Sequence, residues 1–389
     1  MIFEMIRADD AHILRQWLAR VYPPPTALSY AIDADAQECV ALLLEDATSN
    51  EASLALRAAI RAGSLDTIVN LVQRGANVNY QYMTARTPLD SAVLTNRIDI
   101  VQFLTAQGAR SARGKSILLT AVHHPELSSD MFTYLISREP NINVYDEHND
   151  TPLMIATREG VVTASSLLAQ DARVNWFAQN DIGETVLHCA AAANNVEILR
   201  AALAAGVDVN AVTQGGQTAL HMATATLAAE CIGVLLEHNI NLDARDSMGS
   251  VALVSAILSG NGPIVYQLID AGANPNIGAS AGDTCLSLAV EMGHEGIVGA
   301  LVYAGATITQ HVLAQLAHSP RPTRAAIIRL LRLFGAQITH AEAGTLVAPV
   351  RLNPIDAANR ETLIDAQARG TLNEDLVDLI ARMRNNIGE

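Results

Sequence analysis

Apolar and small residues recur along this chain in paired helical patterns at a nearly constant step. The segment Thr87-Pro88-Leu89-Asp90-Ser91-Ala92 is echoed by segments that begin at Thr151, Thr185 and Thr218. Weaker echoes begin at Leu54, Ser116, Val251 and Thr284. The step from Thr185 to Thr218, like three others in the chain, is 33 residues. Such self-similarity predicts a stack of repeated supersecondary units, each too small to bury its own apolar faces.

Each unit contains the signals for two helices and a tight turn. Thr can cap a first helix, and a following Pro is tolerated in its first turn. An apolar i, i+3, i+4 pattern, as in Ile100–Leu104, then predicts a second amphipathic helix. A Gly after that helix can adopt the left-handed backbone conformation that ends a helix. The chain then continues through Asn into a hairpin. The hairpin tips carry a residue that tolerates positive φ, namely Gly183, Gly216, Gly249, Gly282 or Asn149.

At these residues the sequence resembles the ankyrin-repeat family. The resemblance implies an all-α solenoid of helix-turn-helix units with β-hairpin loops, about twelve repeats including degenerate terminal caps. We expect three segments: degenerate or capping repeats in 1–53, central repeats in 54–310, and degenerate or capping repeats in 311–389. A last helical pair is expected near 361–369 and 373–384, and the stretch 340–360 is not assigned.

The composition agrees with thin, closely stacked layers. Half of the residues are hydrophobic, only 4% are aromatic, and 64 are Ala. This apolar content excludes a disordered chain. No apolar run reaches the roughly 18 residues that a membrane span needs, and Met1–Asp10 lacks the features of a signal peptide. The four cysteines are scattered, which favours reduced thiols and a cytoplasmic protein.

The net charge of −15 bears on the partner. It argues against binding nucleic acid, whose backbone needs a basic surface. It favours a protein partner, possibly one with a basic surface, that the acidic array would attract. We expect a monomer.

Residues that could carry chemistry have simpler structural interpretations. His188 and Cys189 are helix neighbours, whose side chains point about 100° apart and cannot form a dyad. In the family that the sequence resembles, the His at the place of His188 and His221 hydrogen-bonds between repeats. The cluster His123-His124-Pro125-Glu126 lacks a further ligand group at zinc spacing and is interpreted as a solvated loop. We therefore expect no catalytic, cofactor-binding or metal-binding residues.

The family resemblance implies a protein partner bound by hairpin tips and the exposed side of the first helices. Five of the 15 aromatic residues fall in three hairpins, although alanine-rich layers leave little room for rings elsewhere. The simpler alternative is that each ring covers its own loop. The later tips are blander, which places binding in the first half or the middle. The candidate partner-binding residues are Tyr80, Tyr82, Met83, Tyr145, Glu147, His148, Trp176, Phe177, Asp181 and Ile182.

One compositional feature is not explained by the fold. Lys115 is the only lysine beside 24 arginines. A GC-rich genome would deplete Ile and Asn as well, yet the chain has 29 Ile and 23 Asn. Arginine cannot accept ubiquitin. The alternative function is therefore a bacterial effector delivered into a eukaryotic host cytosol, or an adaptor beside a ubiquitin ligase. The competing interpretation is an idiosyncratic preference for arginine on the helices.

Overall fold

The computed structural model describes residues 2–81, 86–278, 283–318 and 321–333, and every element below lies in these ranges. The chain divides into two compact units, Met1–Asn175 and Trp176–Glu389. The repeat pattern alone does not predict this division. The predicted segments 1–53, 54–310 and 311–389 were defined by how closely their repeats follow the family pattern, not by contacts. That division remains a prediction. The expected pair at 361–384 lies outside the described residues, as do Gly282 and the stretch 340–360.

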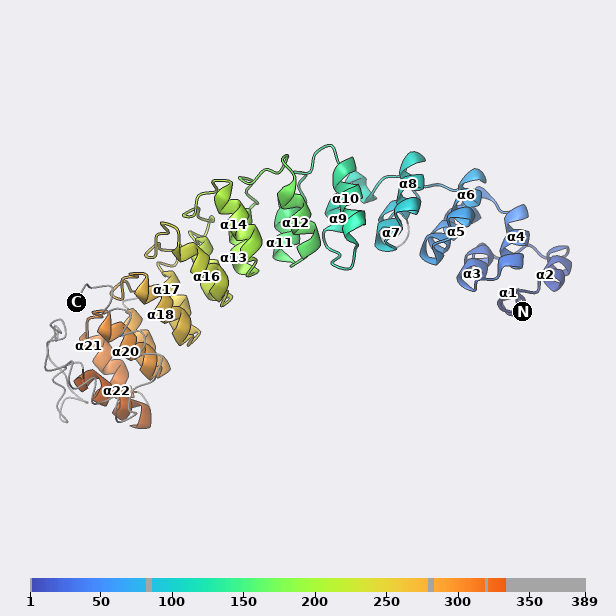
Figure 1. Ribbon diagram of the computed structural model, residues 1–389. Helices are drawn as coiled ribbons and strands as arrows, with labels where there is room; N and C mark the ends of the chain where they lie inside the picture. Colours follow the sequence, from blue (N-terminus) through green and yellow to red (C-terminus); the bar gives the residue numbers. More distant parts are fainter. Residues whose placement is uncertain (1, 82–85, 279–282, 319–320, 334–389) are drawn as a thin grey trace. The chain divides into compact units, whose positions relative to one another are not determined.

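Unit 1 consists of successive helical pairs (Figure 1). Each odd-numbered helix is the first of its pair, and α1, α3, α5 and α7 each pack against the next first helix, whereas α10 packs against α12. The helices are α1 (Ile2–Arg7), α2 (Ala11–Leu18), α3 (Ala27–Asp33), α4 (Gln37–Glu45), α5 (Ser49–Ala62), α6 (Leu65–Gln73), α7 (Pro88–Leu94), α8 (Ile98–Ala106), η1 (Ala112–Gly114), α9 (Ile117–Ala121), α10 (Ser129–Arg138), α11 (Pro152–Arg158) and α12 (Val162–Gln170).

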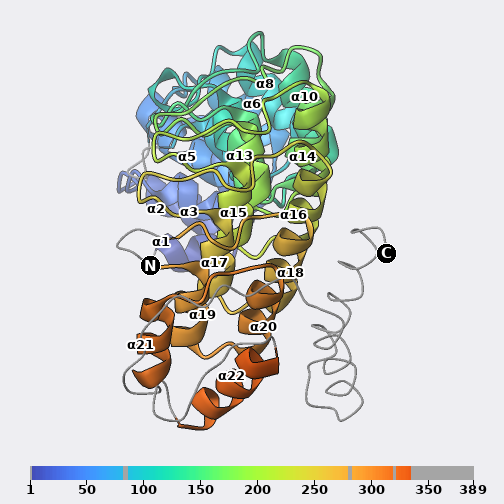
Figure 2. The same ribbon diagram turned by 90° about the vertical axis from the view of Figure 1, so that its left-hand side faces the viewer.

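Unit 2 repeats this arrangement in two layers. Figure 2 shows the first helices α13, α15, α17 and α19 in one layer and the second helices α14, α16, α18 and α20 beside them. The helices are α13 (Val186–Ala192), α14 (Val196–Ala204), α15 (Ala219–Ala225), α16 (Ala229–Leu236), α17 (Ala252–Leu258), α18 (Gly262–Asp270), α19 (Cys285–Met292), α20 (Glu295–Tyr303), α21 (Gln310–His318) and α22 (Arg321–Leu333).

The first helices begin at capping residues, as the sequence predicts. Thr218 Oγ1 accepts a hydrogen bond from the N–H of His221, and the His221 ring accepts one from the N–H of Thr218 at 3.2 Å. Equivalent reciprocal caps join Thr87 to Asp90 and Thr48 to Glu51 in unit 1. Each cap satisfies backbone N–H groups that have no partner within the helix.

The histidines of unit 2 also link neighbouring repeats. His221 Nε2 lies 3.2 Å from the carbonyl oxygen of Ser250, and His188 Nε2 lies 3.1 Å from that of Gln217. Because a carbonyl can only accept, Nε2 carries the proton in both rings. Both histidines are buried, and burial lowers the pKa of each ring. The inter-repeat role implied by the resemblance is therefore present at both positions.

An Asn that follows several of the second helices forms a second link. Asn210 Nδ2 donates to the carbonyl oxygen of Asn239 at 3.2 Å, and Asn210 Oδ1 accepts from the N–H of Asn241 at 2.7 Å. Asn276 makes the equivalent pair of hydrogen bonds, to the carbonyl oxygen of Gly305 and from the N–H of Thr307. The sequence marks this Asn as a repeat signal, and the structure shows why it recurs: one side chain satisfies two groups of the next repeat.

The turn between first and second helix needs a left-handed residue. Gly, Asn or Asp holds this place in eight of the described units, with φ between 48° and 75°. The ninth is Leu227, at φ 59°. For a residue with a branched side chain this conformation costs roughly 1–2 kcal/mol. The residues at this place are Asp9, Asp35, Gly63, Asn96, Gly160, Asn194, Leu227, Gly260 and Gly293.

Candidate functional site

The hairpin tip before Thr151, in unit 1, is a rigid five-residue turn. The carboxylate of Asp146 accepts hydrogen bonds from the N–H groups of His148 and Asp150, each at 2.9 Å. Asn149 lies at φ 60°, as the sequence predicts for this place. The turn therefore holds Tyr145, Glu147 and His148 at the surface, and 48% of Tyr145 is exposed.

An ion pair fixes this tip to the preceding repeat. The ammonium of Lys115, directly after η1, hydrogen-bonds the carboxylate of Glu147. That hydrogen bond and the positive charge lower the pKa of Glu147. The only lysine of the chain is thus engaged at the predicted partner surface. Both side chains remain substantially exposed, so the pair contributes little stability.

The other candidates of unit 1 are Tyr80, Tyr82 and Met83. Tyr80 is half-buried at the end of the turn that begins at Asn77, where its N–H donates to the Asn77 carbonyl oxygen at 3.0 Å. Tyr82 and Met83 lie outside the described residues.

Unit 2 presents a more apolar hairpin. Phe177 is 62% exposed and Ile182 is 55% exposed, whereas Trp176 is half-buried. Asn180 Oδ1 accepts from the N–H groups of Ile182 and Glu184, at 3.2 and 2.8 Å, which fixes the tip beside the exposed Asp181. Trp176 is therefore largely covered by the loop, whereas Phe177 and Ile182 keep more than half of their surface exposed.

Neighbouring tips of unit 2 are joined through their backbones. The N–H of Gln214 donates to the carbonyl oxygen of Ile182 at 2.8 Å, and that of Ser247 to the carbonyl oxygen of Gly215 at 2.7 Å. Gly183 lies at φ 78°, and a Cβ there would lie 3.1 Å from the Gln214 nitrogen. A larger residue would therefore separate adjacent tips.

Two exposed apolar side chains extend the surface beyond the predicted residues. Val212 is 50% exposed and Met248 is 71% exposed, on the two hairpins that follow. The sequence predicts bland tips here, because these hairpins lack aromatic residues. Their exposed apolar groups could have been found by aligning each tip on its left-handed Gly.

Potential catalytic groups are occupied or deeply buried. All four cysteines are buried and unbridged. Burial raises the pKa of the thiols of Cys39 and Cys285 to about 12 and that of Cys231 to about 11, which disfavours a reactive thiolate.

Each of the two histidines in the predicted solvated loop lies beside the carboxylate of a glutamate. His123 Nδ1 lies 2.7 Å from Glu159, and His124 Nδ1 lies 3.1 Å from Glu126. Within the described ranges, no three His, Cys, Asp or Glu side chains are grouped in a way that could hold a metal ion.

Comparison with known families agrees with the capping boxes, the Asn links and the hairpins. A model described as "Ankyrin repeats (3 copies)" matches residues 28–113, 118–213, 163–246 and 193–279. A model of the single ankyrin repeat matches residues 281–311. The chain belongs to the ankyrin-repeat family. Proteins of this family are generally non-catalytic interaction modules.

Two curated relatives carry the same kind of array. The B-cell lymphoma 3 protein homolog of Mus musculus is 29% identical over 151 residues, which cover 35% of this chain and 33% of that protein. The nuclear factor NF-kappa-B p105 subunit of Gallus gallus is 26% identical over 157 residues, which cover 38% of this chain and 13% of that protein. The chain thus matches a third or less of the length of each relative.

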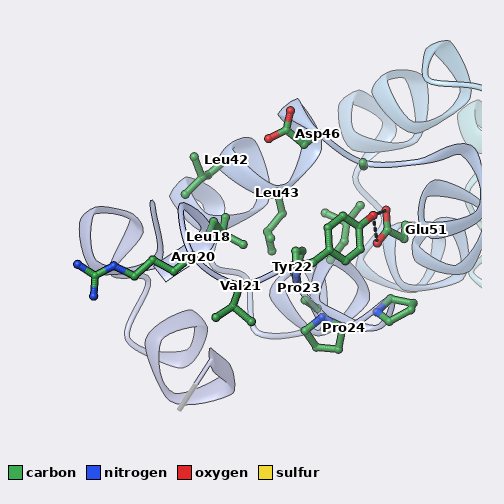
Figure 3. Close-up of a pocket in the computed structure, with 14 residues that line it drawn as sticks. Leu18, Arg20, Val21, Tyr22, Pro23, Pro24, Leu42, Leu43, Asp46 and Glu51 are labelled. Atoms are coloured by element: carbon green, nitrogen blue, oxygen red, sulfur yellow. Dashed lines mark hydrogen bonds between the residues drawn. The ribbon is translucent and has the colours of Figure 1, made fainter. Parts of the chain in front are cut away.

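This ankyrin-repeat chain also has an apolar cavity near its N-terminus, in unit 1. It measures about 340 Å³ and is lined by Leu18, Leu28, Leu43 and the run Pro23–Pro25. Figure 3 shows the Tyr22 ring on one side, with its hydroxyl on the carboxylate of Glu51 at 3.1 Å. This hydrogen bond raises the pKa of Tyr22. Glu51 also caps α5, so its carboxylate serves a structural role.

A second surface lies on the first helices, at their C-terminal ends, and the sequence did not single out its residues. It is the row of side chains at the last turn of each first helix and in the turn that follows it, here called the first-helix edge. In unit 2 three apolar members of this row are exposed, to between 44 and 51%. They are Leu227, Leu258 and Met292.

Among the described residues, no helix is both long enough and apolar enough to cross a membrane.

Proposed function

We propose that this chain is a non-catalytic scaffold that binds a protein partner through its hairpin tips. The observation that carries the proposal is the exposure of large apolar side chains on tips that hydrogen bonds hold rigid: Tyr145 in unit 1, and Phe177 and Ile182 in unit 2. Rigid exposed aromatic residues are typical anchors of protein interfaces, because little side-chain entropy is lost when they are covered.

The acidic charge of the array suggests the character of the partner. With a net charge of −15, the surface would attract a basic protein and repel nucleic acid. Buried, unbridged thiols are compatible with a reducing cytoplasm, where we place the protein. We further propose that it acts as a monomer.

The test is affinity purification with quantitative mass spectrometry, comparing wild type with Tyr145→Ala and Phe177→Ala. We expect proteins captured by the wild type to fall about tenfold with at least one variant, because interface aromatic residues are often hot spots. Val162→Ala is the matched control, since Val162 is 61% exposed but lies at the start of α12 instead of on a hairpin. Equal capture by the wild type and both hairpin variants would remove the hairpins from the binding surface.

A second candidate function rests on Lys115. The only amine of any side chain is engaged with Glu147, so the described surface offers a ubiquitin ligase little to modify. We propose, as the alternative, an effector acting in a eukaryotic host cytosol or an adaptor beside a ubiquitin ligase. The test adds exposed amines through Gln214→Lys and Ser247→Lys, with arginine at the same positions as control. A half-life shortened by lysine but not by arginine supports this function, and equal half-lives contradict it.

A further inference from the structure

The first-helix edge of unit 2 contains a residue that its own fold does not favour. Leu227 adopts the left-handed conformation that Gly, Asn or Asp adopts in eight other described units. In the preceding unit, Asn194 uses this place to accept a hydrogen bond from the N–H of Cys231 at 3.3 Å. A leucine side chain cannot accept such a bond. Leu227 therefore carries backbone strain and also loses an inter-repeat contact.

Burial does not compensate for this strain. Leu227 is 44% exposed, so a large part of its apolar surface stays in water. Strain of this kind is kept where something other than the isolated fold benefits from it. Covering an exposed leucine is favourable for any apolar partner that reaches it.

The neighbouring repeats continue the apolar surface. Leu258 ends α17 and is 51% exposed, and Met292 ends α19 and is 45% exposed. Helices α15, α17 and α19 are consecutive first helices that pack against one another. Adjacent turns on this edge are in contact, since a Cβ at Gly260 would lie 2.8 Å from the ring of His294. Leu227, Leu258 and Met292 lie at the same end of three consecutive first helices, and this row is here called the apolar strip.

The segment that contains the apolar strip is strongly acidic. Residues 176–311 contain twelve carboxylates against Arg200 and Arg245, a net of −10. Arg200 pairs with Glu237, and Arg245 donates to the carbonyl oxygens of Gly249 and Gly278. The arginines of α22 come only after this segment.

Exposed carboxylates lie beside the apolar strip itself. Glu230 follows Leu227 in the first turn of α16, and Glu291 precedes Met292. Glu197 holds the place of Glu230 in the preceding unit. In the part of the chain that the structure describes, neither Glu230 nor Glu291 forms an ion pair.

We propose that the apolar strip binds a basic amphipathic helix of a partner protein. Leucine-sized side chains of that helix cover Leu227, Leu258 and Met292, and its arginines or lysines meet Glu230 and Glu291. The length fits, because first helices lie about 8–10 Å apart and a helix of about 18 residues spans ~27 Å. The proposal rests on the general function of the chain as a protein scaffold but uses a surface separate from the hairpins.

The probes are two helix-forming peptides of about 18 residues, each with leucine at every third or fourth position. One carries arginine beside the leucine stripe and the other carries glutamate. Binding to the full chain is measured by fluorescence anisotropy at low and high salt. We expect only the arginine peptide to bind, and more weakly at high salt, because exposed ion pairs are screened. Binding of neither peptide, or equal binding of both, would overturn the proposal.

Leu227→Asn separates binding from folding. We expect this variant to bind the arginine peptide about fivefold or more weakly, because apolar contact area is lost. We also expect its thermal midpoint to rise by ~2–4 °C, because Asn tolerates the left-handed conformation and can accept the inter-repeat bond. A variant that is less stable than wild type, or that binds unchanged, would contradict the role given to Leu227.

Val212→Ser is the matched control. Val212 is 50% exposed in the same acidic unit but lies on a hairpin, so this variant should bind the arginine peptide like the wild type. If Val212→Ser weakens binding as much as Leu227→Asn, the peptide is not held at the apolar strip. Failure of these peptides leaves the hairpin proposal intact, since that proposal is tested by Tyr145→Ala and Phe177→Ala.

Discussion

The first-helix edge differs in chemistry between the two units. In unit 1 it carries Asp33, Arg61, His123 and Arg158. In unit 2 it carries Leu227, Leu258 and Met292. These side chains of unit 1 have polar partners: Arg61 lies 2.6 Å from Asp33, His123 lies 2.7 Å from Glu159, and Arg158 lies 2.5 Å from Asp150. Leu94 is the apolar member of the row in unit 1, and it is half-buried. The same end of the first helices therefore carries hydrogen-bonded polar side chains in unit 1 and exposed apolar side chains in unit 2.

The start of the first helices differs between the units in a related way. Unit 1 caps α5 and α7 with the carboxylates of Glu51 and Asp90, whereas unit 2 caps α13 and α15 with His188 and His221. The difference shows that one backbone frame accepts either a charged or a neutral group, provided that it can accept a hydrogen bond from the threonine N–H.

The largest expected effect tests whether these two kinds of cap are equally important. His221→Ala leaves the Thr218 N–H and the Ser250 carbonyl without their side-chain partner and opens a cavity, which should cost about 2–4 kcal/mol of unfolding free energy in unit 2. Asp90→Ala should cost unit 1 a similar amount. Urea unfolding measures both, because Trp17 and Trp176 allow one tryptophan to report on each unit when the other is changed to Phe. A loss below about 1 kcal/mol for either variant would show that its cap is dispensable.

A pH series sharpens the same comparison. Burial lowers the pKa of His188 and His221, so the folded unit binds fewer protons than the unfolded chain near the ordinary histidine pKa of 6.5. Stability of unit 2 should therefore be complete above pH 6.5 and fall as the pH drops through that value. The Trp176 signal in urea measures this dependence, and His188→Gln with His221→Gln should flatten it. An unchanged pH dependence in the double variant would assign the effect to other groups.

Much of the fold could be predicted from particular residues because the repeat signals act locally. Thr218 caps a helix, and Gly216 and Asn149 adopt positive φ. Both requirements depend only on residues nearby in the sequence. The inter-repeat position of His221 followed from a family resemblance, since its partner is 29 residues away.

The candidate site was less predictable because exposure depends on neighbouring repeats. Trp176 and Phe177 look equivalent in the sequence, yet one is half-buried and the other is 62% exposed. The apolar strip escaped notice because Leu227 resembles an ordinary helical leucine until its left-handed φ is known. Comparing what each repeat places at the turn after its first helix would have revealed it.

A smaller effect is expected from transferring the unusual residue within unit 2. Asn194→Leu would give the preceding unit the strain that Leu227 carries and remove the hydrogen bond from the Cys231 N–H. We expect a loss of about 1–2 kcal/mol, measured through Trp176 in urea. Asn194→Gly, which keeps the conformational freedom but not the bond, should lose less. If Asn194→Leu is as stable as wild type, the left-handed position is not strained by leucine, and the argument for Leu227 weakens.

The smallest effect is expected where unit 1 is made to resemble unit 2. The Arg61 and Asp33 side chains are 64 and 41% exposed, so a double-mutant cycle with Arg61→Leu and Asp33→Leu should give a coupling of only ~0.2–1 kcal/mol, reduced further by salt. Because the Arg61–Asp33 pair hardly stabilises the fold, its main effect is to keep the first-helix edge of unit 1 polar. The doubly substituted chain should then bind the leucine-rich arginine peptide through unit 1 as well, raising the stoichiometry measured by calorimetry above that of wild type. An unchanged stoichiometry would show that apolar side chains alone do not make an edge a binding surface and that the surrounding carboxylates of unit 2 are also needed.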